Sequence, residues 1–368
     1  MRLLITTDTV GGVWTFTQEL TAGLLERGCH VRQVSFGRMP SDSQRAHCAA
    51  LAERFPLQFA YVASDIALEW MHANGRVMEE GSRLLRREAA LFGPDLIHCN
   101  QFCFGALETA VPRVITAHSD VLSWASACRN VPLEQSSWLD RYGAMVQAGL
   151  LASCAVAAPT RWMMEALAEN FTVPEISAII PNGRSLATDP VTRDDRIAPL
   201  QAVTAGRLWD EAKGIDLLSE VEAPIPIAIA GEMREACRAD WTGVRWMGQL
   251  AEGEMIELLR SSSIYLCLSR YEPFGLAALE AALCGCAVVS RDIAPLREVW
   301  ADSAIYFRDA RQLCSILHML KEDPAVLVRA RISAQRRAQL FSRDRMVDGY
   351  LALFGQTLRR ALRAEHVA

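Results

Sequence analysis

The chain has 368 residues, of which 51% are hydrophobic and 22% are charged, and its formal net charge is −5. This length exceeds what one hydrophobic core usually serves, so two domains are expected, and the composition excludes a mainly disordered chain. The negative charge gives no general attraction to nucleic acid. Residues 321–368 differ, with ten basic and five acidic side chains, and indicate either a solvated helical face or a weak peripheral contact with a membrane.

The eleven cysteines are scattered along the chain without the paired spacing of metal ligands, so no metal site is expected. The sequence shows neither a signal-peptide pattern nor an apolar run of 18 residues. We therefore expect a cytoplasmic protein with reduced thiols, either a monomer or a homodimer.

Short β-rich runs alternate with helical patterns along the first half of the chain. A strand at 2–7, a helix at 15–28 and a strand at 30–36 form the first such unit. Further strands are expected at 95–99, 113–118, 154–159 and 177–182. The alternation predicts a parallel sheet covered by helices on both faces, in a first domain spanning residues 1–185.

A stretch rich in Gly, Pro, Asp and Ser at 182–199 interrupts this pattern and predicts a linker. A second alternating series follows and predicts a second domain at 200–344. Its strands are expected at 200–207, 226–231, 243–248, 263–269, 286–291 and 304–307. The fold class is therefore α/β, with two Rossmann-like, doubly wound domains.

In open parallel sheets, ligands bind beyond the carboxyl ends of the strands, so the residues that follow each strand are the candidates for a site. Here these residues are glycines, cations, a histidine and a carboxylate, which suit a phosphorylated ligand. They are Gly11, Gly12, His118, Gly206, Arg207, Lys213, Gly214 and Glu272.

Arg207 and Lys213 bring two cations to one strand-to-helix loop, an arrangement that suits a diphosphate. The chain has only two lysines against 36 arginines, so a lysine here indicates that a compact ammonium is required. The alternative is a pair of ordinary surface cations.

The segment EPFGLAALE, residues 272–280, predicts a tight turn through Pro273 and Gly275 into a helix. The free N–H groups at the start of that helix form an anion site. Glu272 and Glu280 then flank a phosphate, as the hydroxyl-binding groups of a nucleotide-sugar site would. A solvated pair of carboxylates on a surface helix is the alternative.

Four phrases together resemble the retaining glycosyltransferases of family 4, which have the GT-B fold: GGVW, GR followed by KG, EPFGLAALEA and IPNG. The resemblance covers nearly the whole chain. It implies two domains facing a central cleft, the first binding the acceptor and the second the nucleotide-sugar donor. It also implies that a C-terminal helix at about 345–368 packs back on the first domain.

The resemblance also implies residue roles in the second domain. The donor diphosphate would bind Arg207 and Lys213, with support from the backbone of Phe274, Gly275 and Leu276. Glu280 would bind the ribose of the donor and Glu272 the transferred sugar. The base would lie near Gly231 and Met247.

In the first domain, the resemblance implies that His118 contacts the sugar near the reacting carbon and that Gly12 approaches the donor or acceptor. His118 and Glu272 are thus the candidate catalytic residues; a buried structural role is the alternative for His118. Two departures from the family pattern stand out. Ser119 precedes Asp120, which leaves a role for Asp120 open. Val10 stands where glycogen synthases carry a lysine before the paired glycines, which argues against that branch of the family.

The expected function is a retaining, metal-independent hexosyltransferase of polysaccharide biosynthesis that needs no cofactor, since the chain contains no Asp-x-Asp motif. The favoured donor is a UDP-sugar, with GDP-mannose second, and the acceptor is a glycan, a lipid-linked sugar or a small molecule. Alternatives are a phosphorylase, a nucleotide-sugar epimerase or a non-catalytic sugar-nucleotide-binding subunit. A dinucleotide oxidoreductase is disfavoured because no G-x-G-x-x-G follows the first strand. Aromatic residues at 61–76 and 123–138 either stack on acceptor sugars or pack.

Overall fold

The computed structural model describes residues 1–71, 74–129, 133–186, 191, 200–234, 241 and 243–365. The chain divides into two compact units. The first comprises Met1–Ala125, Val131–Gly183 and Arg343–Ala368, and the second comprises Ser126–Asn130 and Arg184–Ser342. Both ends of the chain therefore belong to the first unit.

The sheet of the first unit has seven parallel strands in the order β3-β2-β1-β4-β5-β6-β7. Six of them lie where the sequence predicts strands, and β3 at the sheet edge was not predicted. The strands are β1 (Arg2–Asp8), β2 (His30–Phe36), β3 (Phe59–Val62), β4 (Leu96–Cys99), β5 (Arg113–Thr116), β6 (Ala155–Ala158) and β7 (Ser177–Ile179).

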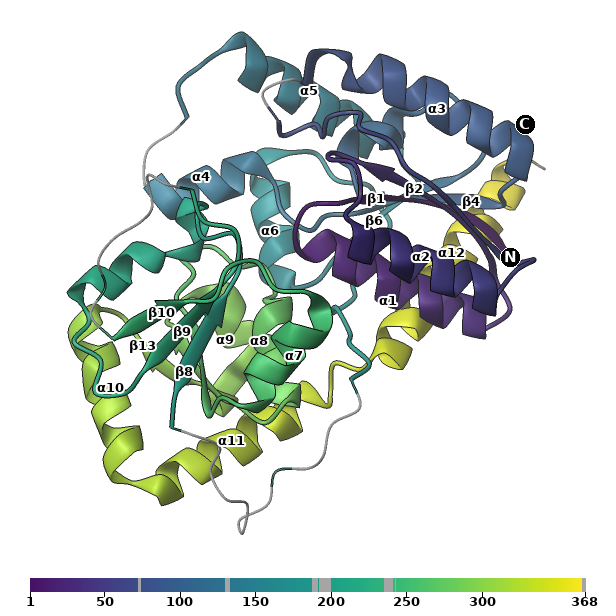
Figure 1. The fold of residues 1–368 in the computed structure, drawn as a ribbon. Helices are drawn as coiled ribbons and strands as arrows, with labels where there is room; N and C mark the ends of the chain where they lie inside the picture. Colours follow the sequence, from purple (N-terminus) through teal and green to yellow (C-terminus); the bar gives the residue numbers. More distant parts are fainter. Residues whose placement is uncertain are drawn as a thin grey trace. The chain divides into compact units, whose positions relative to one another are not determined.

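Helices cover both faces of this sheet, as a parallel sheet requires. One face carries α1 (Gly12–Glu26), α2 (Asp42–Arg54) and α12 (Arg343–Glu365), and the other carries α3 (Val77–Phe92) and α5 (Ser137–Ala152) (Figure 1). The remaining helical segments are η1 (Asn74–Arg76), η2 (Phe102–Ala106), α6 (Arg161–Asn170) and α4 (Val121–Arg129), of which residues 126–129 belong to the second unit.

The second unit repeats the arrangement with six parallel strands in the order β10-β9-β8-β11-β12-β13. All six strands lie within the predicted ranges: β8 (Ala202–Ala205), β9 (Ile227–Ala230), β10 (Val244–Trp246), β11 (Ile264–Cys267), β12 (Ala287–Arg291) and β13 (Ile305–Phe307). The helical segments are η3 (Glu211–Lys213), η4 (Ile215–Glu220), α7 (Glu252–Arg260), α8 (Leu276–Leu283), α9 (Ala294–Trp300), η6 (Ala301–Ser303), α10 (Ala310–Glu322) and α11 (Pro324–Ala338).

Alternating residues of one strand serve two separate cores in the second unit. Ile264 and Leu266 of β11 pack in the core that also contains α10, whereas Tyr265 and Cys267 pack in the core of α7, α8 and α9. Because side chains alternate between the faces of a strand, a run that is apolar throughout is buried on both sides. Figure 1 shows α7, α8 and α9 together on one side of these strands.

The C-terminal helix α12 completes the core of the first unit. Tyr350 and Phe354 are fully buried, and both rings lie against His98 of β4. The Tyr350 hydroxyl is 2.9 Å from Oγ1 of Thr116 in β5. A Cβ added to Gly23 of α1 would lie 2.4 Å from a methyl group of Val347, so the two helices approach closely at this glycine.

The chain passes from the first unit to the second between Gly183 and Arg184, inside the predicted linker at 182–199, and Asn182, Gly183 and Arg184 are buried there. A glycine next to polar residues resembles a loop in composition, although the Arg184 side chain forms ion pairs within the second unit. Residues 187–190 and 192–199 of the predicted linker lie outside the described residues.

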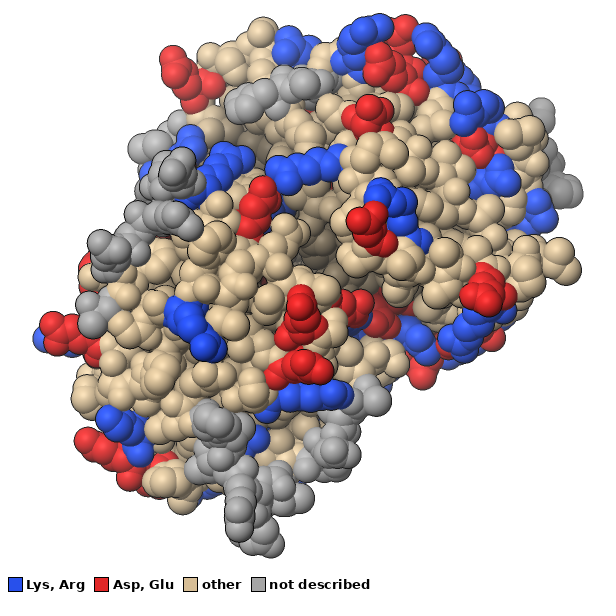
Figure 2. Space-filling model, in the orientation of Figure 1, with Lys and Arg blue, Asp and Glu red and all other residues tan. Residues whose placement is uncertain are grey.

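Among the described residues, no helix combines the length and apolar character needed to cross a bilayer. On the face drawn in Figure 2, basic and acidic side chains are interspersed. Mixed signs of this kind are typical of a solvated surface.

Candidate active site

Glycines end two adjacent strands of the second unit and bring their loops together. Gly206 follows β8 with φ 151°, and Gly231 follows β9 with φ 138°. A Cβ on Gly231 would lie only 1.8 Å from the carbonyl oxygen of Gly206, so no other residue fits there without a shift of the backbone. The loop that carries Arg207 and Lys213 is therefore fixed against the end of β9.

Lys213 lies over Gly206 and reaches Glu272. A Cβ on Gly206 would approach the Lys213 stem to 3.2 Å. The Lys213 ammonium Nζ donates a 2.5 Å hydrogen bond to Oε2 of Glu272, and both side chains are about four-fifths covered. Gly214 ends the turn with φ 61°, and a Cβ there would lie 2.3 Å from the carbonyl oxygen of Leu268. Two sequence-predicted residues thus form one ion pair.

Arg207 is held by the same loop. Its Nη2 donates to Oδ2 of Asp210 at 2.7 Å, while Oδ1 of Asp210 accepts from the backbone N–H of Ala212. Burial alone would raise the pKa of Asp210, but the charge and hydrogen bond of Arg207 outweigh it and leave that pKa lowered. The guanidinium also lies 5.6 Å from the ring of Trp209. Asp210 therefore positions the predicted diphosphate ligand Arg207.

Helix α8 begins as the sequence predicts. Gly275 adopts φ 89° as its N-cap residue, and no described side chain forms a capping hydrogen bond there. The Cγ of Glu272 lies 3.3 Å from the position of a Cβ on Gly275, so Glu272 packs over the start of the helix. The Phe274 side chain is buried against Phe341, which leaves only its backbone for a ligand. Leu276 opens the first turn, and the N–H groups of a first helical turn lack partners within the helix and can bind an anion.

Glu280 of α8 is paired with an arginine that the sequence reasoning missed. Nε of Arg184 lies 2.8 Å from Oε1 of Glu280, and Nη2 of Arg184 lies 2.8 Å from Oε1 of Glu252. The side chain of Arg184 is 6% exposed and that of Glu280 is 15% exposed. Arg184 follows the quoted phrase IPNG directly, so this phrase was the available signal.

At the predicted base site, Trp246 is more prominent than Met247. The indole N–H of Trp246 donates to the carbonyl of Gly231 at 3.1 Å, and 42% of this tryptophan is exposed. Met247 is partly buried against the core of α7, α8 and α9.

In the first unit, Gly11 caps α1 with φ 81°, and Gly12 is the first residue of that helix. Oδ1 of Asp8 accepts the backbone N–H of Val10 at 3.0 Å and orders the turn before it. The predicted approach of Gly12 to a ligand thus rests on an exposed glycine turn at the end of β1.

His118 follows β5 and packs edge-on against Phe16, with ring centroids 4.5 Å apart. Its Nε2 lies 2.8 Å from Oδ1 of Asn100. The Asn100 amide nitrogen donates to the carbonyl of Thr6 at 2.6 Å, so the amide oxygen must face the histidine. Burial lowers the pKa of His118 to about 3. The ring is therefore neutral, with its proton on Nε2 and an acceptor lone pair on Nδ1.

Asp120, whose role the sequence left open, caps α4. It is buried, and its Oδ1 accepts the backbone N–H groups of Leu122 and Ser123, each at 2.9 Å. Burial raises the pKa of this carboxyl group, and its hydrogen bonds to Ser123 and Leu122 oppose the rise. These contacts give Asp120 a structural role.

The aromatic segments predicted for the acceptor contain packed residues. Trp138 stacks on Tyr142 and donates its indole N–H to the carbonyl of Met71 at 2.9 Å. Trp70 packs against the core of the first unit. Residues 72–73 and 130–132 of these segments lie outside the described residues.

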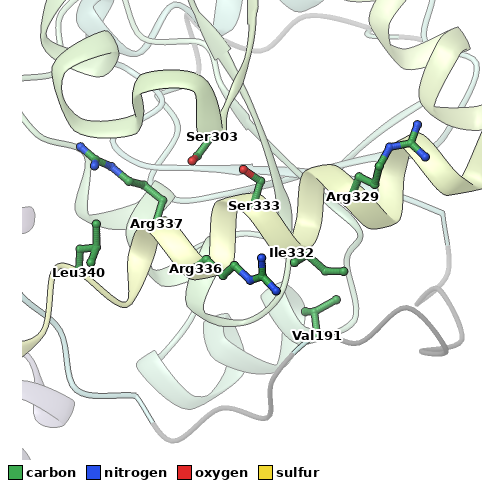
Figure 3. A pocket seen from close by; sticks show the side chains of 8 residues that line it. All are labelled: Val191, Ser303, Arg329, Ile332, Ser333, Arg336, Arg337 and Leu340. Carbon is green, nitrogen blue, oxygen red and sulfur yellow. The ribbon is translucent and has the colours of Figure 1, made fainter.

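A pocket of about 620 Å³ lies along α11 and contains none of the predicted site residues. Its three arginines point in different directions (Figure 3). Arg337 donates to the carbonyls of Val299 and Glu298, so it serves the end of α9. Because these cations do not converge, we assign the candidate site to the strand ends and not to this pocket.

Two parallel α/β units with this arrangement of glycines, cations and carboxylates beyond the strand ends define a glycosyltransferase of the GT-B type. The chain belongs to glycosyltransferase family 4: residues 10–188 match Glycosyltransferase Family 4, and residues 199–323 match Glycosyl transferases group 1.

Named relatives and a solved structure agree with this class. The chain is 26% identical to a glycogen synthase of Mycobacterium tuberculosis, across 93% of this chain and 88% of the relative. It is 27% identical to an alpha-maltose-1-phosphate synthase of the same organism, across 63% and 70%. The fold matches sucrose-phosphate synthase from Thermosynechococcus elongatus with a TM-score of 0.73 at 17% identity, covering 100% of both chains.

Proposed function

We propose that this glycosyltransferase moves a hexose from a nucleotide-diphosphate donor, with UDP-hexose favoured, and retains the anomeric configuration without a metal ion. One observation carries the proposal. A continuous series of contacts runs from Gly206 through Lys213 and Glu272 to Gly275 at the start of α8. It joins a cation, a carboxylate and a helix N-terminus, the groups needed for a sugar attached to a diphosphate.

Charge on the leaving diphosphate would be stabilised by three groups of this unit. An ammonium has three N–H donors, so Lys213 can hold Glu272 and a phosphate oxygen together. The Arg207 side chain is 36% exposed, and its guanidinium has further N–H donors beside the one that contacts Asp210. The start of α8 adds backbone N–H groups. Preorganised donors of this kind lower a barrier because they need no reorganisation during the reaction.

The carboxylates would bind hydroxyl groups on either side of the diphosphate, Glu272 those of the transferred sugar and Glu280 those of the ribose. The Nδ1 lone pair of His118 would accept a hydrogen bond from a sugar hydroxyl. Retention would then follow from attack on the face that the diphosphate leaves, with no covalent intermediate on a side chain.

The relatives are named for making glycogen and maltose 1-phosphate, so a glucan oligosaccharide and sugar phosphates are the first acceptors to test. Purified protein would be incubated with UDP-glucose, GDP-mannose and ADP-glucose, each with these acceptors and with EDTA present. The expected result is acceptor-dependent nucleotide release and a product with the donor's anomeric configuration by NMR.

Three results would contradict the proposal. An inverted anomer would exclude retention. Sugar 1-phosphate formed from a glucan and inorganic phosphate would indicate a phosphorylase. Conversion of the nucleotide-sugar without an acceptor into an isomer would indicate an epimerase.

A further inference from the structure

Arg184 occupies a special place in the chain. The backbone passes from the first unit to the second between Gly183 and Arg184, and returns between Ser342 and Arg343. The two passages are joined: the backbone N–H of Arg184 donates to the carbonyl of Phe341 at 3.1 Å, and Arg184 forms a parallel β-bridge with Ser342.

The side chain of Arg184 extends from this passage to α8. Its two ion-pair partners differ strongly in environment, because the Glu280 side chain is 15% exposed and the Glu252 side chain is 63% exposed. An exposed pair contributes little, so the contact with Glu280 is the significant one. The pairing places one planar guanidinium against both carboxylates, a geometry that lysine does not reproduce.

Stability alone does not explain this pair. The neighbours of Glu280 in α8 are the buried residues Leu279, Ala281 and Ala282, and apolar residues of similar volume often stabilise a core as well as a buried ion pair does. A carboxylate at position 280 therefore points to a ligand, and its arginine to the orientation of that carboxylate.

We propose that Arg184 is a positioning residue for nucleotide binding, which holds the Glu280 carboxylate toward the ribose and links nucleotide occupancy to the two paired passages of the chain. The inference rests on the proposed role of Glu280 in the nucleotide site. Coupling between two sites is reciprocal. If the backbone at Arg184 orients Glu280 for the nucleotide, a nucleotide bound to Glu280 must in turn order the backbone at Arg184.

Ribose recognition gives a readout that a purely structural role would not change. Affinities for UDP and 2′-deoxy-UDP, with the GDP and ADP pairs in parallel, would be measured by calorimetry for the wild type and for Arg184→Gln. We expect the wild type to prefer the ribonucleotide by about tenfold, the effect of one hydrogen-bonded hydroxyl. Arg184→Gln should bring this ratio close to one with little change in affinity for the deoxynucleotide. Arg184→Lys should give an intermediate ratio.

Glu252→Gln is the matched control, because it removes the exposed partner of the same guanidinium and should leave the ratio unchanged. Hydrogen exchange supplies the second readout. Nucleotide should slow amide exchange in peptides covering residues 180–186 and 338–345 of the wild type, and this protection should be absent in Arg184→Gln.

The outcomes separate this inference from the proposed function. If no nucleotide binds the wild type, both the proposed function and the role of Arg184 are contradicted. If the wild type prefers ribonucleotides through Glu280, as shown by loss of the preference in Glu280→Gln, but Arg184→Gln keeps the ratio and the protection, only the role of Arg184 falls. If Arg184→Gln does not fold, Arg184→Lys decides: a reduced ratio supports the inference, and the full wild-type ratio overturns it.

Discussion

The ammonium of Lys213 and the carboxylate of Glu272 lie 2.5 Å apart, although 59 positions of sequence separate them. Both side chains are largely covered, so each needs the other as long as no ligand is bound. Lys213→Ala should lower turnover by about 100-fold, because it removes a preorganised donor from the leaving diphosphate. Initial rates of nucleotide release measure this, and EDTA should leave the wild-type rate unchanged.

Lys321→Ala is the matched control for Lys213→Ala. It removes the other lysine of the chain, whose ammonium donates to the carbonyl of Pro224 at 3.0 Å, away from the candidate site. Its turnover should equal that of the wild type. Full activity of Lys213→Ala would exclude the assigned role, and so would an equal loss in both variants.

Gly231→Ala should weaken nucleotide binding and lower the free energy of unfolding by about 1–3 kcal/mol, because the residue has φ 138° and its new Cβ would meet the Gly206 carbonyl oxygen. Urea denaturation and nucleotide calorimetry would test this. Gly253→Ala is the control, since nothing lies within 4 Å of its Cβ position in α7. Gly253→Ala should raise the free energy of unfolding by about 0.5–1 kcal/mol. Equal stability of the two variants would contradict the close approach of the loops.

His118 should stay neutral across the pH range of activity, because burial lowers its pKa to about 3. Nitrogen NMR of labelled histidine should show the Nε2-protonated tautomer from pH 8 to pH 5. Asn100→Asp should raise the His118 pKa, since a carboxylate at that position favours imidazolium. An imidazolium signal from His118 of the wild type at pH 6 would contradict the neutral Nε2-protonated state.

His98 makes stability depend on pH. Burial first, and the nearby His118 second, lower its pKa to about 3, whereas an unfolded histidine titrates near 6.5. Between these values the unfolded chain binds more protons, so the free energy of unfolding falls as pH drops, by about 1.4 kcal/mol per pH unit. His98→Gln removes this dependence.

The measurement compares wild type with His98→Gln by urea denaturation at pH 7 and pH 5. The free energy of unfolding of His98→Gln relative to that of the wild type should be higher at pH 5 than at pH 7. The buried carboxyl groups of Glu69 and Asp120, whose pKa values are raised, titrate in both proteins and cancel in the comparison. An identical difference at both pH values would contradict a buried neutral His98.

The strands of both sheets were predictable because runs such as IAIA at Ile227–Ala230 are apolar on both faces and lie between turn residues. The edge strand Phe59–Val62 was missed although all four of its residues are apolar, because so short an apolar run does not by itself distinguish a strand from a packed loop or helical segment. The turn at Gly275 was also readable, because a glycine before a helix of small residues indicates positive φ.

Pairings between distant residues could not be read in the same way. Nothing local in the sequence indicates that Lys213 meets Glu272, or that Arg184 meets Glu280, because these contacts arise from the order of strands in the sheet. Arg184 was further concealed by neighbours whose composition resembles a linker. Phe274 was assigned by its motif, and only packing shows that its ring belongs to the core.

Tyr350 and Phe354 of α12 fill the core beside His98, a residue of the fourth strand. During translation, the ribosome releases that strand some 250 residues before these rings. The core of the first unit therefore stays incomplete while the second unit is synthesised. A chain that lacks residues 343–365 therefore has an incomplete first unit, so chaperones would meet this enzyme at the half that is made first and completed last.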